Sequence, residues 1–438
     1  MMKLLILIVV VLGILAVAQL ARVYELTSRL RGKREEDISP GDNRFNGRMM
    51  WLFLVAFFGF FLWLVLAYKD KMLPVAASEH GAETDWLMDF NWWILISVFV
   101  ITNILLFWFA GKYLHSKDRR AFWQPHNNKL ELAWTIAPAA VLAVIIIYGL
   151  NSWAGMTSPA SPDAIVVELY AKQFDWTARY PGVDGGLGAT DVRLINGTNP
   201  LGIVTRESVS ARLAELDKEI QTTDSLLSHA ILAHAKTDEL TDQVGRMRRN
   251  KTRIINLREL MEMDIKEKGV ASTYLHGADD IVTKDFHLPV NQEVKLVIRS
   301  QDVLHSAYMP HLRAQMNAVP GMTTTIKMVP TITTDSMRTI PEVVDEVAGI
   351  NALRKQAGKE PYEFNFILLC NKICGASHYN MQMPLIVTTA AEHEAWMAEA
   401  VKKPFQAPPA PLEAPVPPTA DTTLVAPAAV AEAHTTTH

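Results

Sequence analysis

Residues 370–381 read CNKICGASHYNM and contain both cysteines of the 438-residue chain. Cys370 and Cys374 are four positions apart, His378 follows four residues later, and Met381 lies three residues beyond it. Thiolates, imidazoles and thioethers are the soft and borderline ligands that select copper. The stretch therefore predicts a metal site, and the rest of the sequence must supply the fold that carries it.

Two readings of the cysteine pair remain open from the residues alone. Outside the cytoplasm two cysteines by default form a disulfide. A mononuclear blue-copper site needs only one cysteine, so a second thiolate instead suits a pair of copper ions, each with one terminal nitrogen. His378 supplies one nitrogen, and the candidates for the second are His305, in the segment DVLHS at 302–306, and its neighbour His311.

Four apolar runs indicate a membrane protein. Each reaches the roughly 18 to 20 residues that a helix needs to cross a hydrocarbon core, and none contains Asp, Glu or Arg. The runs cover residues 3–20, 51–68, 92–110 and 132–150. The first also fits a cleavable signal peptide that would end at Ala18.

Loop charges favour a retained first helix. The connection 21–49 carries seven Lys or Arg residues, 69–91 carries two, and 111–131 carries five. By the positive-inside rule the first and third connections are cytoplasmic. We therefore expect four spans in a bacterial inner membrane, with lipid around them and with both termini and everything after residue 150 on the periplasmic side.

The chain after residue 153 has short strand-like runs with apolar and polar alternation, which indicates an all-β sandwich. The expected strands lie at 164–169, 294–298, 325–329, 363–369 and 385–387. Residues 203–269 instead show helical spacing and predict two antiparallel helices joined near 236–238. This hairpin either packs only on itself or serves as a partner-binding arm. The Pro- and Ala-rich segment 404–438 predicts a disordered tail, and the pI of 6.4 gives no sign of a nucleic-acid partner.

The combined motifs resemble subunit II of cytochrome c oxidases of the haem-copper family. The family's copper loop has the pattern C-x-x-x-C-G-x-x-H-x-x-M, and its first histidine lies in a D-V-L-H-S segment. The segment HNNKLELAWTIAPA at 126–139 resembles the lead into a family helix. The resemblance covers roughly 90–180 and 278–390.

The resemblance implies a fold and a ligand set. The fold is membrane-anchored and all-β, with transmembrane α-helices followed by a cupredoxin-like Greek-key β-sandwich that carries the helical-hairpin insertion. The first two spans, the insertion and the tail fall outside the resemblance. The expected domains are an extension with two spans at 1–90, a helical hairpin at 91–152, the sandwich at 153–202 and 270–403, the insertion at 203–269 and the tail at 404–438. The ligands of a dinuclear CuA centre with two copper ions would be His305, Cys370, Cys374, His378, Met381 and, through its carbonyl, Lys372.

Some positions depart from the family pattern. Lys372 replaces a glutamate whose side chain helps to bind magnesium, and a cation cannot ligate a hard cation, so that metal is in doubt, as is the aspartate that the family has at Asn317. Phe174 replaces the tryptophan that admits electrons in the family. Trp176 is retained, either as part of the electron entry or as an aromatic side chain of the core. Glu131 matches a glutamate that marks the mouth of a proton channel, although it could equally be a solvated interfacial carboxylate.

The resemblance implies a function as well. We expect this chain to be the subunit at which electrons enter a proton-translocating terminal oxidase. The donor would be cytochrome c or a cytochrome c domain of another respiratory complex. The electrons would pass to haem in subunit I, which reduces oxygen to water. Subunit I and the other oxidase subunits would be its partners. No Cys-x-x-Cys-His occurs, so no covalent haem is expected. The rivals are a membrane-anchored copper chaperone or thiol oxidoreductase, which needs a βαβ pattern around its cysteines, and a quinol-oxidase subunit II, which lacks the copper ligands.

Overall fold

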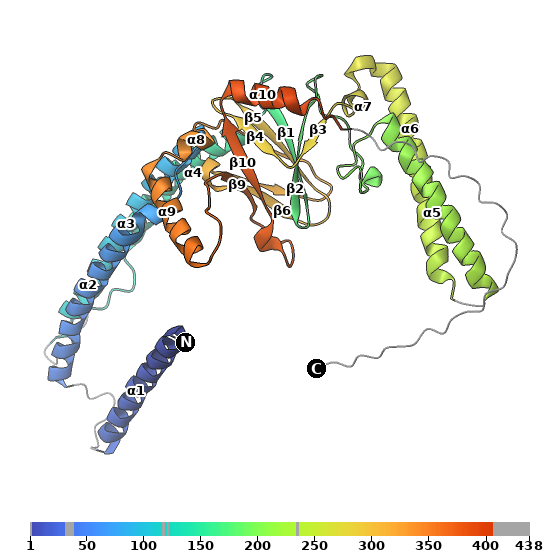
Figure 1. Cartoon of the computed structure of the whole chain (residues 1–438). Helices are drawn as coiled ribbons and strands as arrows, with labels where there is room; N and C mark the ends of the chain where they lie inside the picture. Colours follow the sequence, from blue (N-terminus) through green and yellow to red (C-terminus); the bar gives the residue numbers. More distant parts are fainter. Residues whose placement is uncertain (1, 31–38, 116–118, 121, 234–235, 406–438) are drawn as a thin grey trace, which may run out of the picture. The chain divides into compact units, whose positions relative to one another are not determined.

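The computed structural model describes residues 2–30, 39–115, 119–120, 122–233 and 236–405 (Figure 1). The chain divides into two compact units, and each is described by itself below. One contains residues 1–158 with the turn 310–313, and the other contains residues 159–309 and 314–438. The predicted tail lies outside the described residues from position 406 onward.

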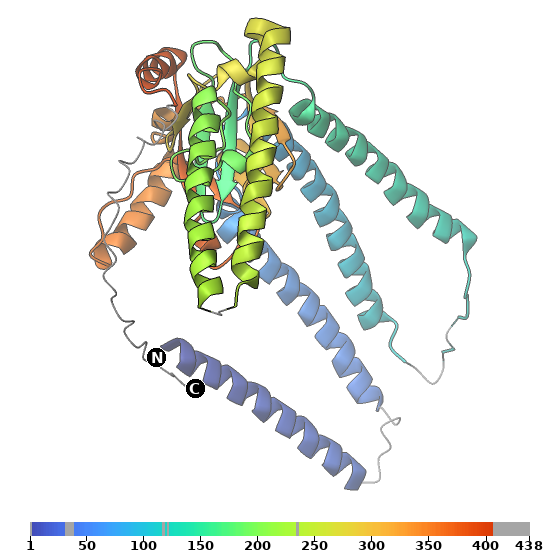
Figure 2. The same cartoon turned by 90° about the vertical axis from the view of Figure 1, so that its right-hand side faces the viewer.

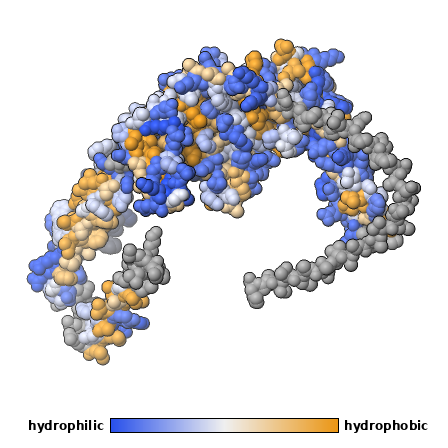
Figure 3. Space-filling view, viewed as in Figure 1, coloured by the Kyte–Doolittle hydropathy of each residue, from blue (hydrophilic) through white to orange (hydrophobic). Residues whose placement is uncertain are grey.

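Four long helices form most of the first unit, and each contains one of the predicted apolar runs. Over the described residues, these helices are long and apolar enough to cross a membrane, and their apolar windows are not buried inside the protein. Figure 3 shows apolar side chains along them. The helices are α1 (Met2–Leu30), α2 (Pro40–Tyr68), α3 (Glu79–Lys112) and α4 (Asn128–Thr157). The predicted transmembrane helices are thereby confirmed.

Glycine permits the close contact between α2 and α3. A Cβ atom on Gly111 would lie 2.6 Å from Trp51 Nε1 and 3.1 Å from the Gly47 carbonyl oxygen. Farther along the same pair of helices the ring centroids of Phe53 and Phe107 are 5.0 Å apart. Since lipid is as apolar as these side chains, close packing holds such helices together, and small residues at the contact allow it.

The turn 310–313 belongs to the same unit. Arg313 donates from Nε and a terminal nitrogen to the two carboxylate oxygens of Asp85, at 2.7 and 2.8 Å. Ser78, which caps α3, donates its hydroxyl to the Leu312 carbonyl at 2.7 Å. The bidentate Arg313–Asp85 ion pair and the Ser78 hydrogen bond together bind this turn to the beginning of α3.

The second unit is built from two five-stranded sheets. The strand order is β3-β2-β1-β5-β8 in one sheet and β4-β10-β9-β6-β7 in the other. The pairs β1–β5 and β4–β10 are parallel, and the remaining pairs are antiparallel. The strands are β1 (Ile165–Lys172), β2 (Asp175–Tyr180), β3 (Ile281–Thr283), β4 (Phe286–Pro289), β5 (Val294–Ser300), β6 (His305–Met309), β7 (Ala314–Ala318), β8 (Thr324–Met328), β9 (Phe366–Cys370) and β10 (Gln382–Thr388). The predicted β-sandwich is confirmed.

All five strands expected from the sequence are present, as β1, β5, β8, β9 and β10. In β5 every second residue is buried, which is the alternation that the sequence displays. The other strands were missed because they are short or carry polar residues, as in the AQMNA of β7. The core between the sheets includes the fully buried Trp176, Phe286 and Phe366.

The insertion between β2 and β3 forms the predicted helical hairpin, with α5 (Arg206–Leu232) and α6 (Asp238–Lys268) side by side (Figure 2). Thr205 and Ser208 form a capping box that starts α5 at this point. The hairpin does not pack only on itself, because Leu194 and Val204 of the preceding loop join its apolar cluster. That cluster also contains Val209, Leu213, Leu216, Ile254, Leu257 and Met261.

Buried charges fix the loop that leads to the hairpin. Arg179 pairs with Glu168 at 2.5 Å and with Asp280 at 2.9 Å, and all three side chains are at most 3% exposed. Asp280 also accepts a hydrogen bond from the Gly188 backbone at 3.1 Å. Burial raises the pKa of Asp280 to about 6, against the opposing effect of Arg179. Removal of one member of such a set leaves an uncompensated buried charge, which is strongly destabilising.

Helix α10 (Ala390–Ala400) covers one edge of the sandwich with an aromatic cluster. The Trp396 ring stacks on His287 with centroids 4.4 Å apart and meets Tyr180 at 5.0 Å. His393 is 5% exposed, and its Nε2 atom has no hydrogen-bond partner among the described residues. Burial, reinforced by the charge of His287, lowers the pKa of His393 to about 4. The remaining helices of this unit are α7 (Thr273–His276), α8 (Thr334–Met337) and α9 (Pro341–Gln356).

Two deletions in the hairpin should have different effects on stability. Replacing residues 220–249 by a short Gly-Ser turn joins the helices near the Asp217–Lys251 ion pair and keeps the apolar cluster. We expect little change in the melting temperature of the full chain. Deleting 206–268 exposes Leu194 and Val204, which should cost about 3–6 kcal/mol. Circular-dichroism melting of both variants tests this, and equal melting temperatures would contradict it.

The second prediction concerns pH. Because the pKa of His393 is lower in the folded protein than in the unfolded chain, the unfolded state binds the proton first as the pH falls. The stabilisation is complete above about pH 6.5 and is lost toward pH 4, by about 3 kcal/mol. Urea unfolding at pH 7 and pH 4 measures the loss, and His393→Phe should reduce it. An identical loss in that variant would contradict the assignment.

Candidate metal centre

The pairing of β6 with β9 brings the predicted ligands to one end of the second sheet. Ala307 is the register partner of Cys370, and the Asn371 backbone donates to the Ser306 carbonyl at 3.0 Å. His305 is the first residue of β6 and Cys370 is the last of β9, so both lie at this end. The loop after Cys370 returns to the sheet at Gln382, the first residue of β10.

Five predicted side chains form one cluster. His305 Nδ1 lies 3.7 Å from Cys370 Sγ, and His378 Nδ1 lies 3.6 Å from Cys374 Sγ. The two Sγ atoms are 3.9 Å apart, and Met381 Sδ is 3.7 Å from Cys374 Sγ. Each thiol therefore has its own imidazole, and the thioether completes one side. The donor set suits a soft metal such as copper.

The two cysteines are free thiols. A disulfide has an S–S distance of about 2.05 Å. At 3.9 Å the two sulfur atoms are not bonded in this structure, so they do not form the disulfide that was the alternative. Both side chains are buried, as are His305 at 0% and Met381 at 1% exposure. Burial, with the charge of Cys370 as a second cause, raises the pKa of Cys374 to about 11. A metal ion bound by this side chain would release the proton, because metals bind the thiolate form of cysteine.

Lys372 offers its backbone to the same cluster. Its carbonyl oxygen lies 3.2 Å from Cys370 Sγ, while the residue as a whole is exposed. A contact through the backbone carbonyl does not depend on the side chain, so a lysine is compatible with this position beside the two thiols.

The structure separates the two candidate histidines. His311 belongs to the short helix η4 (Pro310–Leu312), beyond the end of β6 opposite to His305, and its Nδ1 lies 3.0 Å from the Val75 carbonyl oxygen. His305 instead shares a group with Cys370 and Cys374 whose ligand atoms all lie within 4.8 Å of one another.

The residues considered for electron entry and proton uptake lie outside the cluster. Trp176 is fully buried, and its ring centroid is 6.2 Å from that of His305. Phe174 is partly buried, in the turn between β1 and β2. Glu131 lies in the first turn of α4 and accepts a 3.3 Å hydrogen bond from the Asn127 backbone, so it also acts as a helix cap.

Asp302 was missed as a functional residue, although it stands in the quoted DVLHS segment. Its Oδ1 accepts a 2.9 Å hydrogen bond from His305 Nε2, which fixes the ring so that Nδ1 faces the thiols. Although burial opposes it, hydrogen bonds from the Gln173 backbone and from His305 lower the pKa of Asp302. Such a carboxylate behind a histidine is typical of metal ligands.

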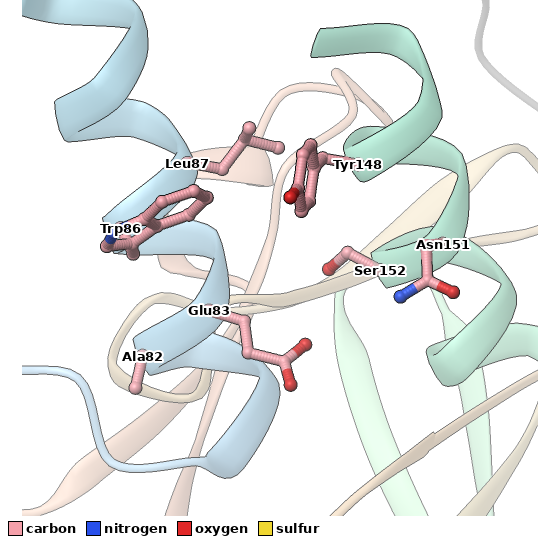
Figure 4. A pocket seen from close by; sticks show the side chains of 7 residues that line it. All are labelled: Ala82, Glu83, Trp86, Leu87, Tyr148, Asn151 and Ser152. Atoms are coloured by element: carbon pink, nitrogen blue, oxygen red, sulfur yellow. The ribbon is translucent and has the colours of Figure 1, made fainter. Parts of the chain in front are cut away.

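A separate hollow of about 460 Å³ lies in the first unit between α3 and α4 (Figure 4). It is lined by Ala82, Glu83, Trp86, Leu87, Tyr148, Asn151 and Ser152. The Glu83 carboxylate and the polar ends of Asn151 and Ser152 face one another there, whereas Trp86 and Leu87 form an apolar wall. Its lining contains no cysteine, histidine or methionine, which are the residue types of the candidate metal centre.

The fold and the cluster define a class: a protein with membrane-spanning helices and a β-sandwich that carries soft donor side chains at one end. Residues 66–151 match the family described as cytochrome c oxidase subunit II, transmembrane domain, and residues 266–352 match its periplasmic domain. The second match includes His305 and ends before Cys370. Both matches are therefore to domains of cytochrome c oxidase subunit II, one on the helical part of this chain and one on its β-rich part.

Individual relatives are distant but cover most of the chain. The chain is 26% identical over 318 residues to the alternative cytochrome c oxidase subunit 2 of Bradyrhizobium diazoefficiens, covering 72% of this chain and 79% of the relative. It is 19% identical to cytochrome c oxidase subunit 2 of Cereibacter sphaeroides, covering 76% and 79%. A crystal structure of the periplasmic domain of oxidase subunit II from Bradyrhizobium japonicum aligns with a TM-score of 0.25 and 14% identity, over 57% of this chain and 99% of that one.

The raised pKa of Cys374 has a measurable consequence. In the metal-free full chain at pH 8, iodoacetamide should alkylate Cys374 about 100-fold more slowly than a free cysteine, because little thiolate is present. Unfolding in SDS should restore the ordinary rate. Mass spectrometry of the tryptic peptide follows the reaction, and rapid native alkylation would contradict the burial of this thiol.

Proposed function

We propose that this chain is the subunit at which electrons enter a terminal oxidase, and that its cluster holds a dinuclear copper centre. The observation that carries the proposal is the pairing of each thiol with its own imidazole, at 3.7 and 3.6 Å. The proposed ligands are His305, Cys370, Lys372 through its carbonyl, Cys374, His378 and Met381. These residues would hold two copper ions, and such a pair would supply one-electron transfer at this end of the sandwich.

The donor set favours two ions over one. A single tetrahedral ion, such as zinc, takes four ligands at 2.0–2.3 Å and would draw all of them close together. The group within 4.8 Å contains His305, Cys370 and Cys374 but not His378. The thioether of Met381 and the carbonyl of Lys372 bring the number of donors to six. Six donors, two of them thiols, are more than one tetrahedral ion takes and so favour two ions.

The protein itself performs three tasks in this proposal. Burial of the thiols and of Met381 excludes water, so that a change of charge at the centre reorganises few solvent dipoles. Asp302 holds His305 in one orientation through its Nε2 hydrogen bond. Trp176, 6.2 Å from the His305 ring, offers a buried aromatic contact for electron transfer, and Phe174 occupies the neighbouring turn.

The partners and orientation complete the proposal. We place both termini and the sandwich on the periplasmic side of a bacterial inner membrane, because the basic connections 21–49 and 111–131 favour the cytoplasm. Cytochrome c, free or as a domain of another respiratory complex, would supply electrons, and haem in subunit I would receive them. Glu131 would then lie at the cytoplasmic mouth of a proton channel. The exposed Lys372 side chain cannot replace the glutamate of a magnesium site.

The alternative classes agree less well with the site. A copper chaperone or thiol oxidoreductase would expose a reactive cysteine near a βαβ unit. Here both cysteines are buried, Cys370 at the end of β9 and Cys374 in the loop that leads to the antiparallel strand β10. A quinol-oxidase subunit would lack these ligands. The arrangement therefore supports electron transfer by a buried centre.

The proposal predicts the result of copper loading. The full chain in detergent should bind two copper ions and show the EPR signal of one electron shared by both. His305→Ala should abolish or convert that signal, whereas His311→Ala should leave it unchanged. One copper with a blue-copper spectrum, a single zinc ion, or the reverse response of the two histidines would each overturn the assignment.

A further inference from the structure

A third loop reaches the metal end of the sandwich besides the two that carry ligands. It is the turn between β1 and β2, at residues 173–174. The parallel pairing of β1 with β5 sets Ala171 opposite Ser300, and the Gln301 backbone donates to the Ala171 carbonyl at 2.9 Å. The turn therefore lies directly beside the loop that precedes His305.

The backbone of Gln173 is bonded to the His305 side of the site. Its N–H donates to Asp302 Oδ2 at 2.7 Å, while Asp302 Oδ1 accepts from His305 Nε2 at 2.9 Å. One carboxylate thus connects the turn to the imidazole. The Val303 backbone donates to the same carboxylate at 2.7 Å, which keeps it in place.

The side chain of Gln173 is bonded to the cysteine side. Its Nε2 donates to the carbonyl oxygen of Cys374. The next residue, Gly375, has a φ of +143°, and a Cβ atom there would lie 2.9 Å from Gln173 Nε2 and equally close to the Phe174 ring. The loop therefore needs glycine at this position, because the glutamine amide and the phenylalanine ring press against its backbone.

We propose that Gln173 is a positioning residue that joins the His305 loop to the cysteine loop and so fixes the spacing between the two halves of the metal site. The inference rests on the proposed function, because the loops matter only if they share a centre. Asp302 reaches the imidazole alone, whereas Gln173 is hydrogen-bonded toward both loops. Phe174, at the position considered for electron entry, acts with it as a wall behind Gly375.

The donor character of the amide is the property to test. Gln173→Glu keeps the length and shape of the side chain but replaces the N–H donor by an oxygen that repels the Cys374 carbonyl. The backbone bond to Asp302 is unchanged. Gln173 is itself exposed, so the substitution removes no core packing. The matched control is Gln292→Glu, the same substitution at an exposed position in the turn before β5.

The experiment measures copper loss from the full chain in detergent. After loading with copper, excess EDTA is added and the decay of the EPR signal is followed. Outer contacts of metal ligands typically contribute 10- to 100-fold in affinity, and we expect Gln173→Glu to release copper at least about tenfold faster than the parent chain. Gln292→Glu should match the parent. Equal rates for Gln173→Glu and the parent would overturn the inference.

A second measurement separates this inference from the proposed function. In the copper-free full chain, hydrogen exchange of the backbone amides of 374–378 should be about tenfold faster in Gln173→Glu than in the parent, because the loop has lost its restraint. If the exchange rate of these amides is unchanged, Gln173 does not position the loop, and the inference fails whether or not copper binds. If the parent chain binds no copper pair, the proposed function fails, while accelerated exchange would still show that Gln173 holds the loop.

Discussion

The site depends on the register between β6 and β9. Ala307 is paired with Cys370, and the Asn371 backbone N–H donates to the Ser306 carbonyl. This pairing brings His305 to the same end of the sheet as Cys370 and Cys374, which follow it by 65 and 69 residues in the sequence. A slip by one residue would turn alternate side chains to the opposite face and remove His305 from the thiols. The alternation of buried and partly buried residues along β9 resists such a slip, because it would turn the buried side chains away from the core.

Burial gives the site its electrical character. The thiols lie in a dry environment that raises the pKa of Cys374 to about 11, so the metal-free loop keeps a neutral, weakly nucleophilic sulfur. The pKa of Asp302 is shifted in the other direction, because its hydrogen bonds favour the charged carboxylate. The same carboxylate holds His305 in a defined tautomer. The side chains of the cluster are therefore held in place by the protein itself, through burial of the thiols and the hydrogen bond between Asp302 and His305.

The same sandwich accommodates a large insertion without disturbing this end. The hairpin is inserted between β2 and β3. The buried ion pairs of Arg179 with Glu168 and Asp280 stabilise the loop that precedes it. Its apolar cluster uses Leu194 and Val204 from the loop itself, so the hairpin and its support form one packed body. An insertion anchored by its own core places little strain on the sheets, which explains how strand pairing beside it remains regular.

Sequence alone determined the four spans, the sandwich, the hairpin and the ligand candidates. Hydropathy and alternation are local, and a cluster of rare residues such as Cys370 to Met381 stands out without structural knowledge. The choice between His305 and His311 came from a resemblance and not from spacing, and only the structure showed that His305 begins β6 beside Cys370 while His311 follows the last residue of that strand. Short polar strands such as β7, the role of Leu194 and Val204, and the contacts of Gln173 and Asp302 were not predictable. Each of these depends on a partner far away in the chain, and the identity of that partner is decided by sheet register and packing, which no local pattern of residues encodes.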